Sequence, residues 1–596
     1  MATSARFVLG GDNGEFATMF ATGGVPHPSG YPAFAVYLRL MSWMPGVSPA
    51  HGAAISTAIL GIAAVVMVRA ACRAWGASLQ SSTLAAVTFG LSPLMWKLST
   101  HAEVFALHAL LAASILRVTG PSARLSLSRR ALLLGLLAGL GLANNHSLVT
   151  IAPLGFYGAY RVLIESPQRL RALGLALGGM CLGLSPYLYL VLVARSGADV
   201  LVWGDTSTAS GLLHHFLRAD YGTTQLAISE ESSSALAHIS RLLVELAKNL
   251  SYVPVVFIVI GVATLFGARR SRPNPGLGLA SASVKAPRLH ESTVREDTRP
   301  STTSVGRRPA LPMGHGVAWL LTWICVGPLF IGMFNLPLEG LATIVVERFY
   351  LLPMVLLCVP LARGIDRVLE GQLRAVEVYS PVCIGLLSLF IVTGLDHVRD
   401  HHRGDVESYL LNSLNTVEPD SVILGTGDHR IYGFHYVQRV LHQREDVTYI
   451  DPLLLNYQWY RSQIEELLGM ELVGISEGSV NSVELAEGLY QAGRSIYLTN
   501  RFSNAIVQGA PNYPIGTLIR IGAPPSPARL EAMNVSVAAN YRYPSGEATD
   551  PDGWAASVNA EYTRPWRVLA QAYESMGDFE AAERCRNHGV IIPSIP

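Results

Sequence analysis

Two carboxylates stand near the beginning of the chain, Asp12 and Glu15, in the segment G-G-D-N-G-E. If a helix begins there, residues three apart share one face at its N-terminal end. A carboxylate can take the proton of an attacking hydroxyl group, and a nearby cation can hold a leaving phosphate. These residue types therefore suit sugar transfer from a phosphate-activated donor. The alternative is that both acids are solvated residues that cap a helix, and spacing alone leaves both interpretations open.

Further polar and aromatic residues lie at the ends of apolar segments. A polar group near bilayer depth is costly, so it is a functional candidate by default, with packing between helices as the alternative. No cysteine partner or His-x3-His spacing accompanies the histidines among them, and we expect no metal. The candidates for contacting a donor phosphate or an acceptor are His27, Tyr31, Glu103, Asn145, His146, Trp203, Asp205, Arg218 and Arg348.

The elements that must position these residues are membrane-spanning helices. Long apolar runs fill residues 50–395, whereas residues 396–596 have the composition of a soluble region. A span needs about 20 predominantly apolar residues, although neighbouring helices tolerate internal Gly and Pro. The expected spans are 52–74, 80–97, 103–118, 130–145, 147–163, 171–195, 249–268, 313–335, 349–363 and 376–395.

Arginine and lysine gather in every second connection between these segments. Basic connections stay in the cytoplasm. This rule places the Asp12 segment, the loop around Trp203–Tyr221 and the C-terminal region together on the external face. We therefore expect a multi-pass protein of a bacterial inner (plasma) membrane whose C-terminal region is periplasmic. The partner of the apolar surface is the lipid bilayer, and a net charge of +1 gives no indication of nucleic-acid binding.

These patterns divide the chain into five parts. An external loop with the acidic motif and interfacial helices (1–48) precedes a bundle of seven spans (49–268), whose external loop is 196–248. A Pro-, Ser-, Thr- and Arg-rich stretch predicts a disordered cytoplasmic linker (269–312) before three more spans (313–395). Apolar runs at 421–426 and 447–450 predict strands with helices between them, and so a soluble α/β domain (396–596).

Two features of the ends complete the predicted organisation. Trp566–Arg584 resembles one helical hairpin of a tetratricopeptide repeat, and we interpret it as a packing hairpin, since one copy cannot form a solenoid. Residues 1–6 are too short to hold a span, although the following segment must lie outside. We expect that one more helix precedes the printed start; the alternative is that the first span inserts with its N-terminus outside.

The motifs resemble the GT-C glycosyltransferase superfamily, in particular the branch with an animal transmembrane O-mannosyltransferase that acts on plexin-type receptor domains. The resemblance rests on G-G-D-N-G-E at 10–15 and V-P-H-P-S-G-Y-P at 25–32, followed in order by E-V-F-A-L, N-N-H-S, L-S-P-Y-L-Y-L, W-G-D and F-L-R-A-D-Y-G-T up to residue 223. R-F-Y-L-L-P at 348–353 is a weaker match. T-G-D-H at 426–429 and R-E-D-V-T-Y-I-D at 444–451 resemble the external domain of bacterial members.

The resemblance implies a GT-C fold and inverting transfer of a sugar from a polyprenyl-phosphate-linked donor to a protein or glycan acceptor, without a further cofactor. The first-loop acid of the family maps to Asp12, with Glu15 as second candidate. The arginine that faces the donor phosphate maps to Arg348, and the motif histidine maps to His27. Ser29 replaces the usual second proline of that motif.

Two functions of other classes stay open on the sequence. A transporter or flippase for a lipid-linked glycan would need charged groups deep within spans or internal repeats, and neither pattern is visible. A non-catalytic envelope scaffold would keep the fold and use the C-terminal region to hold partners. The sugar is not encoded in any recognisable pocket residue; mannose is the choice of the animal relative.

Overall fold

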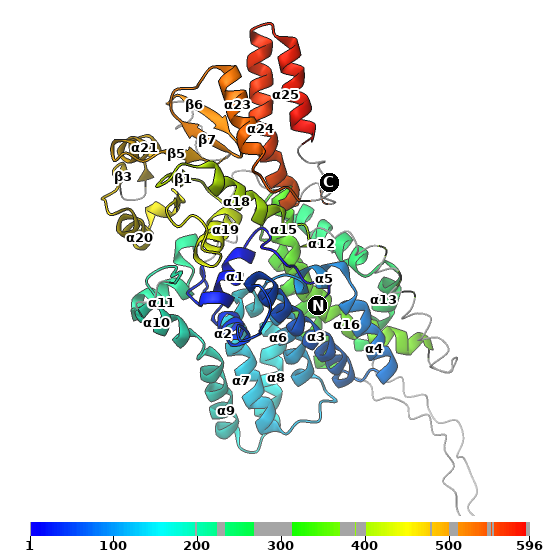
Figure 1. Ribbon diagram of the computed structural model, residues 1–596. Helices are drawn as coiled ribbons and strands as arrows, with labels where there is room; N and C mark the ends of the chain where they lie inside the picture. Colours follow the sequence, from blue (N-terminus) through cyan, green and yellow to red (C-terminus); the bar gives the residue numbers. More distant parts are fainter. Residues whose placement is uncertain are drawn as a thin grey trace, which may run out of the picture.

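A computed structural model describes residues 2–196, 200–222, 233–266, 313–369, 385, 388, 392, 401–476, 479–499, 510–544, 550 and 553–591. Figure 1 shows a helical bundle below and an α/β region above, with the first two helices of the chain between them. The expected linker, 269–312, and nearly all of the expected last span, 376–395, lie outside the described residues.

The bundle is formed by helices that pack around a continuous apolar core. Two tryptophans inside it donate their indole N–H to main-chain carbonyls, Trp75 to Leu116 at 2.8 Å and Trp319 to Leu356 at 3.0 Å. The helices are α3 (Pro49–Ala74), α4 (Leu79–Gly90), α5 (Pro93–Ser99), α6 (Phe105–Thr119), α7 (Leu127–Asn144), η1 (His146–Ile151), α8 (Ala152–Glu165), α9 (Arg169–Leu184), α10 (Tyr187–Arg195), α12 (Ala235–Asn249), α13 (Val253–Phe266), α14 (Met313–Ile324), η3 (Cys325–Leu329), α15 (Leu341–Glu347), η4 (Arg348–Tyr350) and α16 (Leu351–Leu369).

Fewer helices are long enough to cross a bilayer than the ten that the sequence predicts. Within the described ranges, four stretches have sufficient length and hydropathy, or five if α12 and α13, which meet at 110°, form one bent span. The four are Pro49–Ala74, His146–Glu165, Arg169–Arg195 and Leu341–Leu369. Shorter apolar helices, such as Phe105–Thr119 and Met313–Leu329, accompany them.

The expected span at 80–97 shows why fewer described helices are long enough to cross a bilayer than the sequence predicts. The chain breaks between α4 and α5, where the Ser92 hydroxyl accepts a hydrogen bond from the Met95 N–H and Pro93 occupies the first turn. A serine cap followed by proline starts a new helix, and it therefore divides an apolar run that hydropathy treats as continuous.

The upper region contains a mixed five-stranded sheet in the order β2-β1-β5-β7-β6. Strands β2, β1 and β5 are parallel, and β7 and β6 continue the sheet in antiparallel orientation. The strands are β1 (Val422–Leu424), β2 (Thr448–Ile450), β5 (Ile496–Leu498), β6 (Asn512–Ile515) and β7 (Leu518–Ile521), with a small hairpin of β3 (Ile475–Ser476) and β4 (Ser479–Val480). β1 and β2 fall within the two apolar runs that predict strands.

Helices surround this sheet and form the top of the molecule (Figure 1). The last two, α24 and α25, pack against each other across a turn where Gly577 has a φ of 79°. Their relation to the tetratricopeptide repeat stays a prediction. The helices are α18 (Asp405–Thr416), α19 (Asp428–Arg439), η5 (Leu454–Asn456), α20 (Gln458–Leu468), α21 (Ser482–Gln491), α23 (Pro527–Ala538), α24 (Trp554–Ser575) and α25 (Phe579–Ile591).

The segment at 1–48, predicted as an external loop with interfacial helices, packs between the two regions over much of its length, and its end is exposed at Leu40 and Trp43. Its helix α1 (Asn13–Thr22) packs on α3 and on the following helix, α2 (Pro32–Met41), and contacts α19 of the upper region. Nearly all of α1 is buried, including the carboxylate of Glu15. The approach of α1 to α19 is close because residue 14 is glycine: a Cβ there would lie 2.8 Å from the Tyr432 carbonyl carbon.

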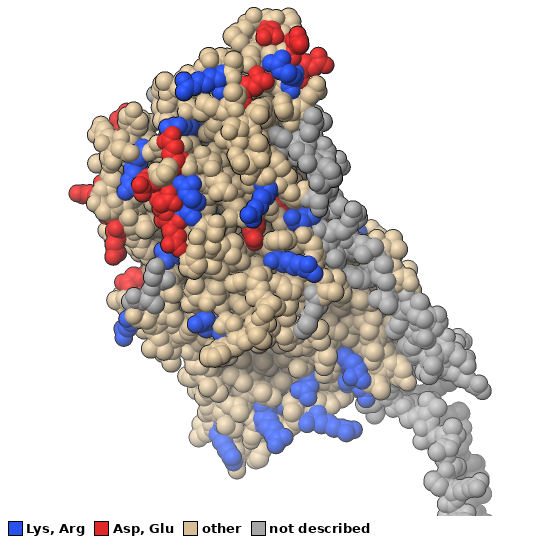
Figure 2. Space-filling model, in the orientation of Figure 1, with Lys and Arg blue, Asp and Glu red and all other residues tan. Residues whose placement is uncertain are grey.

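Charge separates along the long axis of the molecule. Figure 2 shows lysine and arginine without acidic neighbours at the lower end, whereas both signs mix over the upper region. Exposed arginines at the starts of α7 and α9, among them Arg129 and Arg169, belong to the lower end (Figure 1). The basic connections that alternate along the sequence therefore include some that lie together at one end of the bundle.

Candidate functional site

The first acid of the chain and the arginine before α16 are in contact. Arg348 donates from one terminal nitrogen to Asp12 Oδ2 at 2.9 Å and to Glu103 Oε1 at 3.1 Å. Asp12 directly precedes α1, Glu103 precedes α6, and Arg348 begins η4, so three separate segments meet. We call Asp12, Glu15, His27, Glu103 and Arg348 the junction cluster, because they lie where the bundle meets the upper region.

The arginine is held from both sides, yet it keeps an unused donor. Its guanidinium lies over the rings of Phe105 and Phe349, at 5.5 and 5.8 Å from their centroids. The Glu103 carboxylate also accepts a hydrogen bond from the Val104 N–H at 2.9 Å. The Nε of Arg348 is buried and has no hydrogen-bond partner among the described residues. A buried guanidinium N–H without a partner is costly, and an additional anionic oxygen would satisfy it.

The second acid binds the histidine of the proline-restricted stretch. Glu15 accepts two hydrogen bonds from His27, one from the main-chain N–H at 2.8 Å and one from Nδ1 at 2.7 Å. The other ring nitrogen of His27 lies 3.1 Å from the Tyr31 hydroxyl. Because α1 is helical, Asp12 and Glu15 lie near one another, but each has its own cation.

Burial and charge shift the pKa values of these groups in different directions. Burial raises the pKa of Asp12, but the charges of Arg348 and His27 and the hydrogen bond from Arg348 together outweigh it and hold the pKa below the usual value. For Glu15 burial dominates, and the pKa is raised despite the nearby His27. Burial alone would lower the pKa of His27, but the charges of Glu15 and Asp12 raise it to about 9. Of the two carboxylates, Asp12 is thus the one whose ionised form its surroundings favour.

Of the other predicted residues, Tyr31 and Trp203 reach the junction cluster through His27. The rings of His27 and Trp203 are 6.2 Å apart, and the main chain of Trp203 donates to the Val25 carbonyl at 3.0 Å. Arg218, which precedes η2 (Ala219–Tyr221), lies over the ring of Tyr221 at 5.7 Å.

Three predicted residues have other hydrogen-bond partners instead of the junction cluster. Asn145 caps η1, since its side-chain oxygen accepts from the Ser147 N–H at 3.0 Å. Asp205 is exposed and accepts from the N–H and hydroxyl of Ser207. His146 contacts the Tyr187 hydroxyl at 3.2 Å. Asn and Asp side chains commonly accept hydrogen bonds from main-chain groups two residues further along the chain. Asn145 and Asp205 use an oxygen in this way and are not part of the junction cluster.

Asp428 was not among the predicted site residues. It is the first residue of α19 and follows strand β1 within T-G-D-H. The signal was present, because side chains just after the carboxyl ends of parallel strands commonly form sites. No group of three or more metal-ligating side chains arranged to hold a metal ion occurs among the described residues.

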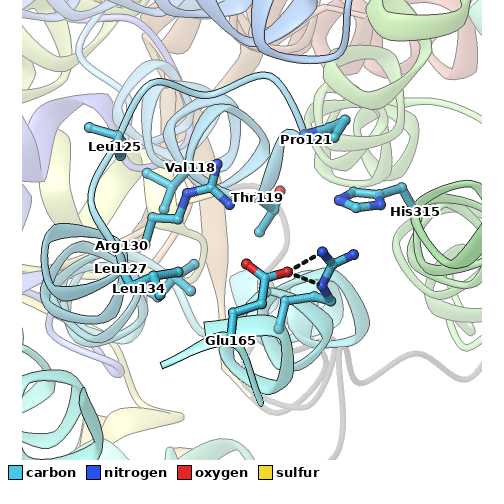
Figure 3. A pocket seen from close by; sticks show the side chains of 11 residues that line it. Val118, Thr119, Pro121, Leu125, Leu127, Arg130, Leu134, Glu165 and His315 are labelled. Atoms are coloured by element: carbon cyan, nitrogen blue, oxygen red, sulfur yellow. Dashed lines mark hydrogen bonds and ion pairs between the residues drawn. The ribbon is translucent and has the colours of Figure 1, made fainter. Parts of the chain in front are cut away.

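A cavity of about 270 Å³ lies in the bundle, away from the junction cluster. Figure 3 shows Arg130, Glu165 and His315 around it, with apolar residues such as Leu134. Each of its charged or titratable side chains has at least one partner: Arg161 pairs with Glu165, Arg130 donates from a terminal nitrogen to the carbonyls of Gly120 and Ala123, and His315 contacts the Tyr157 hydroxyl. Among the described residues, the Arg130 Nε is buried without a hydrogen-bond partner. The His315–Tyr157 contact joins α14 to α8 and the Arg161–Glu165 pair lies within α8, and the cavity contains no acid without a cation partner among the residues that line it.

Comparisons with known proteins agree with the resemblance. The model of the N-terminal domain of protein O-mannosyl-transferase TMEM260 matches residues 12–165. The chain is 27% identical to protein O-mannosyl-transferase TMEM260 of Mus musculus over 478 residues, which cover 77% of this chain and 61% of the mouse protein. It is 28% identical to protein O-mannosyl-transferase tmem260 of Dictyostelium discoideum over 276 residues, 43% of this chain and 34% of that one. The matched region is thus less than two thirds of either relative.

Among solved structures, the crystal structure of ArnT from Cupriavidus metallidurans in the apo state matches 88% of this chain and 96% of that chain. The TM-score is 0.50 and the sequence identity is 13%, a level at which the likeness concerns the fold alone. The resemblance to the O-mannosyltransferase branch is confirmed by the family model and the two relatives, and the chain is a polytopic helical membrane protein with an ArnT-like fold.

Proposed function

We propose that the chain is a membrane glycosyltransferase that moves a sugar from a polyprenyl-phosphate-linked donor to a hydroxyl group of an acceptor on the external face, with inversion at the anomeric carbon. The observation that carries the proposal is the contact between Asp12 and Arg348, which are 336 positions apart in the chain and 2.9 Å apart in space. A base and a phosphate-binding cation at one place are what such a transfer requires.

Each group has one step in the reaction. The Asp12 carboxylate takes the proton of the acceptor hydroxyl, whose oxygen then bonds to the anomeric carbon of the sugar. The bond from that carbon to the phosphate oxygen breaks, and its electron pair leaves with the polyprenyl phosphate. Arg348 stabilises the negative charge of the leaving phosphate, with its buried, unpartnered Nε as the donor that the phosphate can use.

The Asp12–Arg348 contact has two consequences for this chemistry. It keeps Asp12 ionised, because the adjacent positive charge lowers the pKa of the carboxyl group. It also fixes the guanidinium, which Glu103 and the two phenylalanine rings hold as well. A base and a cation that are positioned before the substrate binds lose little further freedom in the reaction. Glu15 holds His27 as a second cation beside them.

The finer assignments follow from the relatives. The names of the mouse and Dictyostelium proteins specify O-mannosyl transfer to protein, which supports mannose as the sugar and a protein acceptor, with a glycan acceptor as the other possibility. Because these relatives are transferases by name, transfer is favoured over transport and over a non-catalytic scaffold. A location in the bacterial inner membrane, with the junction on the periplasmic side, is part of the same proposal.

The experiment is transfer from radiolabelled polyprenyl-phosphate mannose by the protein in lipid nanodiscs. We expect Asp12→Asn to reduce the turnover rate by about 100-fold or more, since general-base catalysis contributes about 10²–10⁴. Glu165→Gln, in the cavity away from the junction cluster, is the matched control and should transfer at the wild-type rate. Normal transfer by the Asp12→Asn variant would remove the base assignment.

A further inference from the structure

The upper region brings a carboxylate to the junction cluster at the start of α19. Two contacts on either side of Asp428 fix its position. The ring of His429 lies 4.9 Å from that of Trp554, and Trp554 packs so closely on Gly10 that a Cβ there would meet the indole ring at 2.0 Å. Four residues after Asp428, Tyr432 touches Gly14.

The same tyrosine also stacks on the junction histidine. The rings of Tyr432 and His27 are 5.6 Å apart and inclined by 24°. Residues four apart in a helix lie on one face, so Asp428 lies on the face of α19 that carries Tyr432. The start of α19 therefore runs beside residues 10–14, and Asp428 lies across from Asp12.

Asp428 differs from the acids of the junction cluster in one respect. Asp12, Glu15 and Glu103 are buried and each accepts a hydrogen bond from a cationic side chain. Asp428 keeps accessible surface, and its carboxylate has no hydrogen bond or ion pair within the part of the chain that the structure describes. It is thus an accessible acid beside the proposed base, with its acceptor oxygens unused.

A structural role at the helix N-terminus does not account for this acid. A carboxylate in the first turn of a helix normally has a lowered pKa, because the helix dipole favours its charge. The carboxylate of Asp428 is open to solvent on one side, but the many protein atoms around the start of α19, together with the negative charge of Asp12, raise its pKa to about 6. The fold therefore keeps a carboxylate where its charge is disfavoured, which is common at functional sites.

We propose that Asp428 orients the acceptor: it accepts a hydrogen bond from the acceptor and so holds the reacting hydroxyl against Asp12. The upper region then completes the active site, with the donor phosphate bound by Arg348 of the bundle and the acceptor bound by α19. This inference rests on the proposed glycosyl transfer, and it assigns to the upper region the part of the site that selects the acceptor.

The test separates acceptor binding from donor binding. Wild type, Asp428→Asn and the control Glu484→Gln, whose carboxylate also lies in the first turn of a helix of the upper region, are compared in nanodiscs. The donor is polyprenyl-phosphate mannose, and the acceptor probes are a Ser/Thr-containing peptide and methyl mannoside. KM is measured for donor and acceptor separately, together with the Tm of each variant.

For Asp428→Asn we expect the acceptor KM to rise about tenfold or more, the loss expected for a hydrogen bond to a charged group. The donor KM should stay within twofold, and the Tm should equal or exceed that of wild type, because a disfavoured charge is removed. The probe that wild type uses identifies the acceptor class.

Two results would overturn the inference while the proposed function stands. One is an acceptor KM of Asp428→Asn that stays within twofold of wild type. The other is a donor KM that rises by the same factor as the acceptor KM. If wild type consumes no donor with either probe, the proposed function fails and the role of Asp428 fails with it.

Discussion

The junction cluster and the cavity between α6, α7, α8 and α14 both contain arginines beside carboxylates, but the pairs are built differently. In the cavity, Arg161 and Glu165 are one helical turn apart, and about a third of each side chain is exposed. In the junction, Arg348 reaches Asp12 and Glu103 across 336 and 245 positions of the chain, and both acids are buried.

This difference supports the junction, rather than the cavity, as the site of the proposed transfer. A local pair on one helix forms easily and contributes little, so it needs no explanation beyond packing. A partly buried arginine that pairs with two buried acids from distant segments is costly to desolvate and gives weak support for stability. Among the described residues, each of the two places has a buried arginine Nε without a hydrogen-bond partner, Arg348 in the junction and Arg130 in the cavity, so the difference lies in the buried acids from distant segments. An arrangement that is unfavourable without ligand and complementary to a phosphate is the expected form of a site.

Substitution of Arg348 is expected to have the largest effect. Arg348→Gln removes the cation that faces the leaving phosphate, and the turnover rate should fall by about 100-fold or more. Arg348→Lys keeps the positive charge but loses the fixed, planar set of donors, so its turnover rate should lie between those of wild type and Arg348→Gln. Transfer assays in nanodiscs with saturating donor measure both variants. Equal rates for wild type and Arg348→Gln would show that the junction does not bind the phosphate.

Loss of Glu15 should have an intermediate effect that appears in the pH dependence. His27 has a pKa raised to about 9, so the His27 cation is present at neutral pH and is lost as the pH rises through 9. In Glu15→Gln the largest opposing charge is gone, and burial should lower the histidine pKa. NMR of ¹⁵N-labelled histidine and the alkaline limb of the pH–rate profile should both move to lower pH. A titration of His27 that is unchanged in Glu15→Gln would contradict the pairing.

The smallest effect is expected in the cavity. Glu165→Gln breaks the local pair with Arg161, and the free energy of unfolding should change by no more than about 0.5 kcal/mol. Thermal unfolding in nanodiscs measures this change, and transfer should stay within twofold of wild type. A loss of transfer comparable to that of Arg348→Gln would make the cavity, rather than the junction, the functional site.

The structure brings together Asp12 and Arg348, the two residues that the resemblance assigns to one donor site, whereas it differs from the sequence prediction over the helices. Alternating basic connections place the Asp12 segment on the external face, and the assignment of Arg348 to the donor phosphate comes from the resemblance. The spans were less predictable because local signals, such as Ser92 before Pro93, divide apolar runs. The likeness to ArnT agrees with the fold class.

Long-range contacts set the limit of prediction for the candidate site. Asn145 and Asp205 are similar to Asp12 in polarity and sidedness, but each uses its Oδ1 to accept hydrogen bonds from a serine two residues further along the chain. Asp428 lies in a region that composition treats as a separate soluble domain, so its position across from Asp12 follows only from the packing of α1 on α19. That packing depends on the glycine at position 14. In the sequence this glycine is only one member of the G-G-D-N-G-E motif, and nothing there shows which helix packs against it.

The most direct measurement is a double-substitution cycle on single-turnover transfer, with Asp12→Asn, Arg348→Gln and the variant that combines them. When two groups act on one donor as a unit, removing either one already removes most of the rate enhancement that both provide. We therefore expect the turnover rate of the combined variant to be within about threefold of that of the slower single variant. A combined variant that is slower by the product of the two single effects would contradict the account, because the two residues would then act independently.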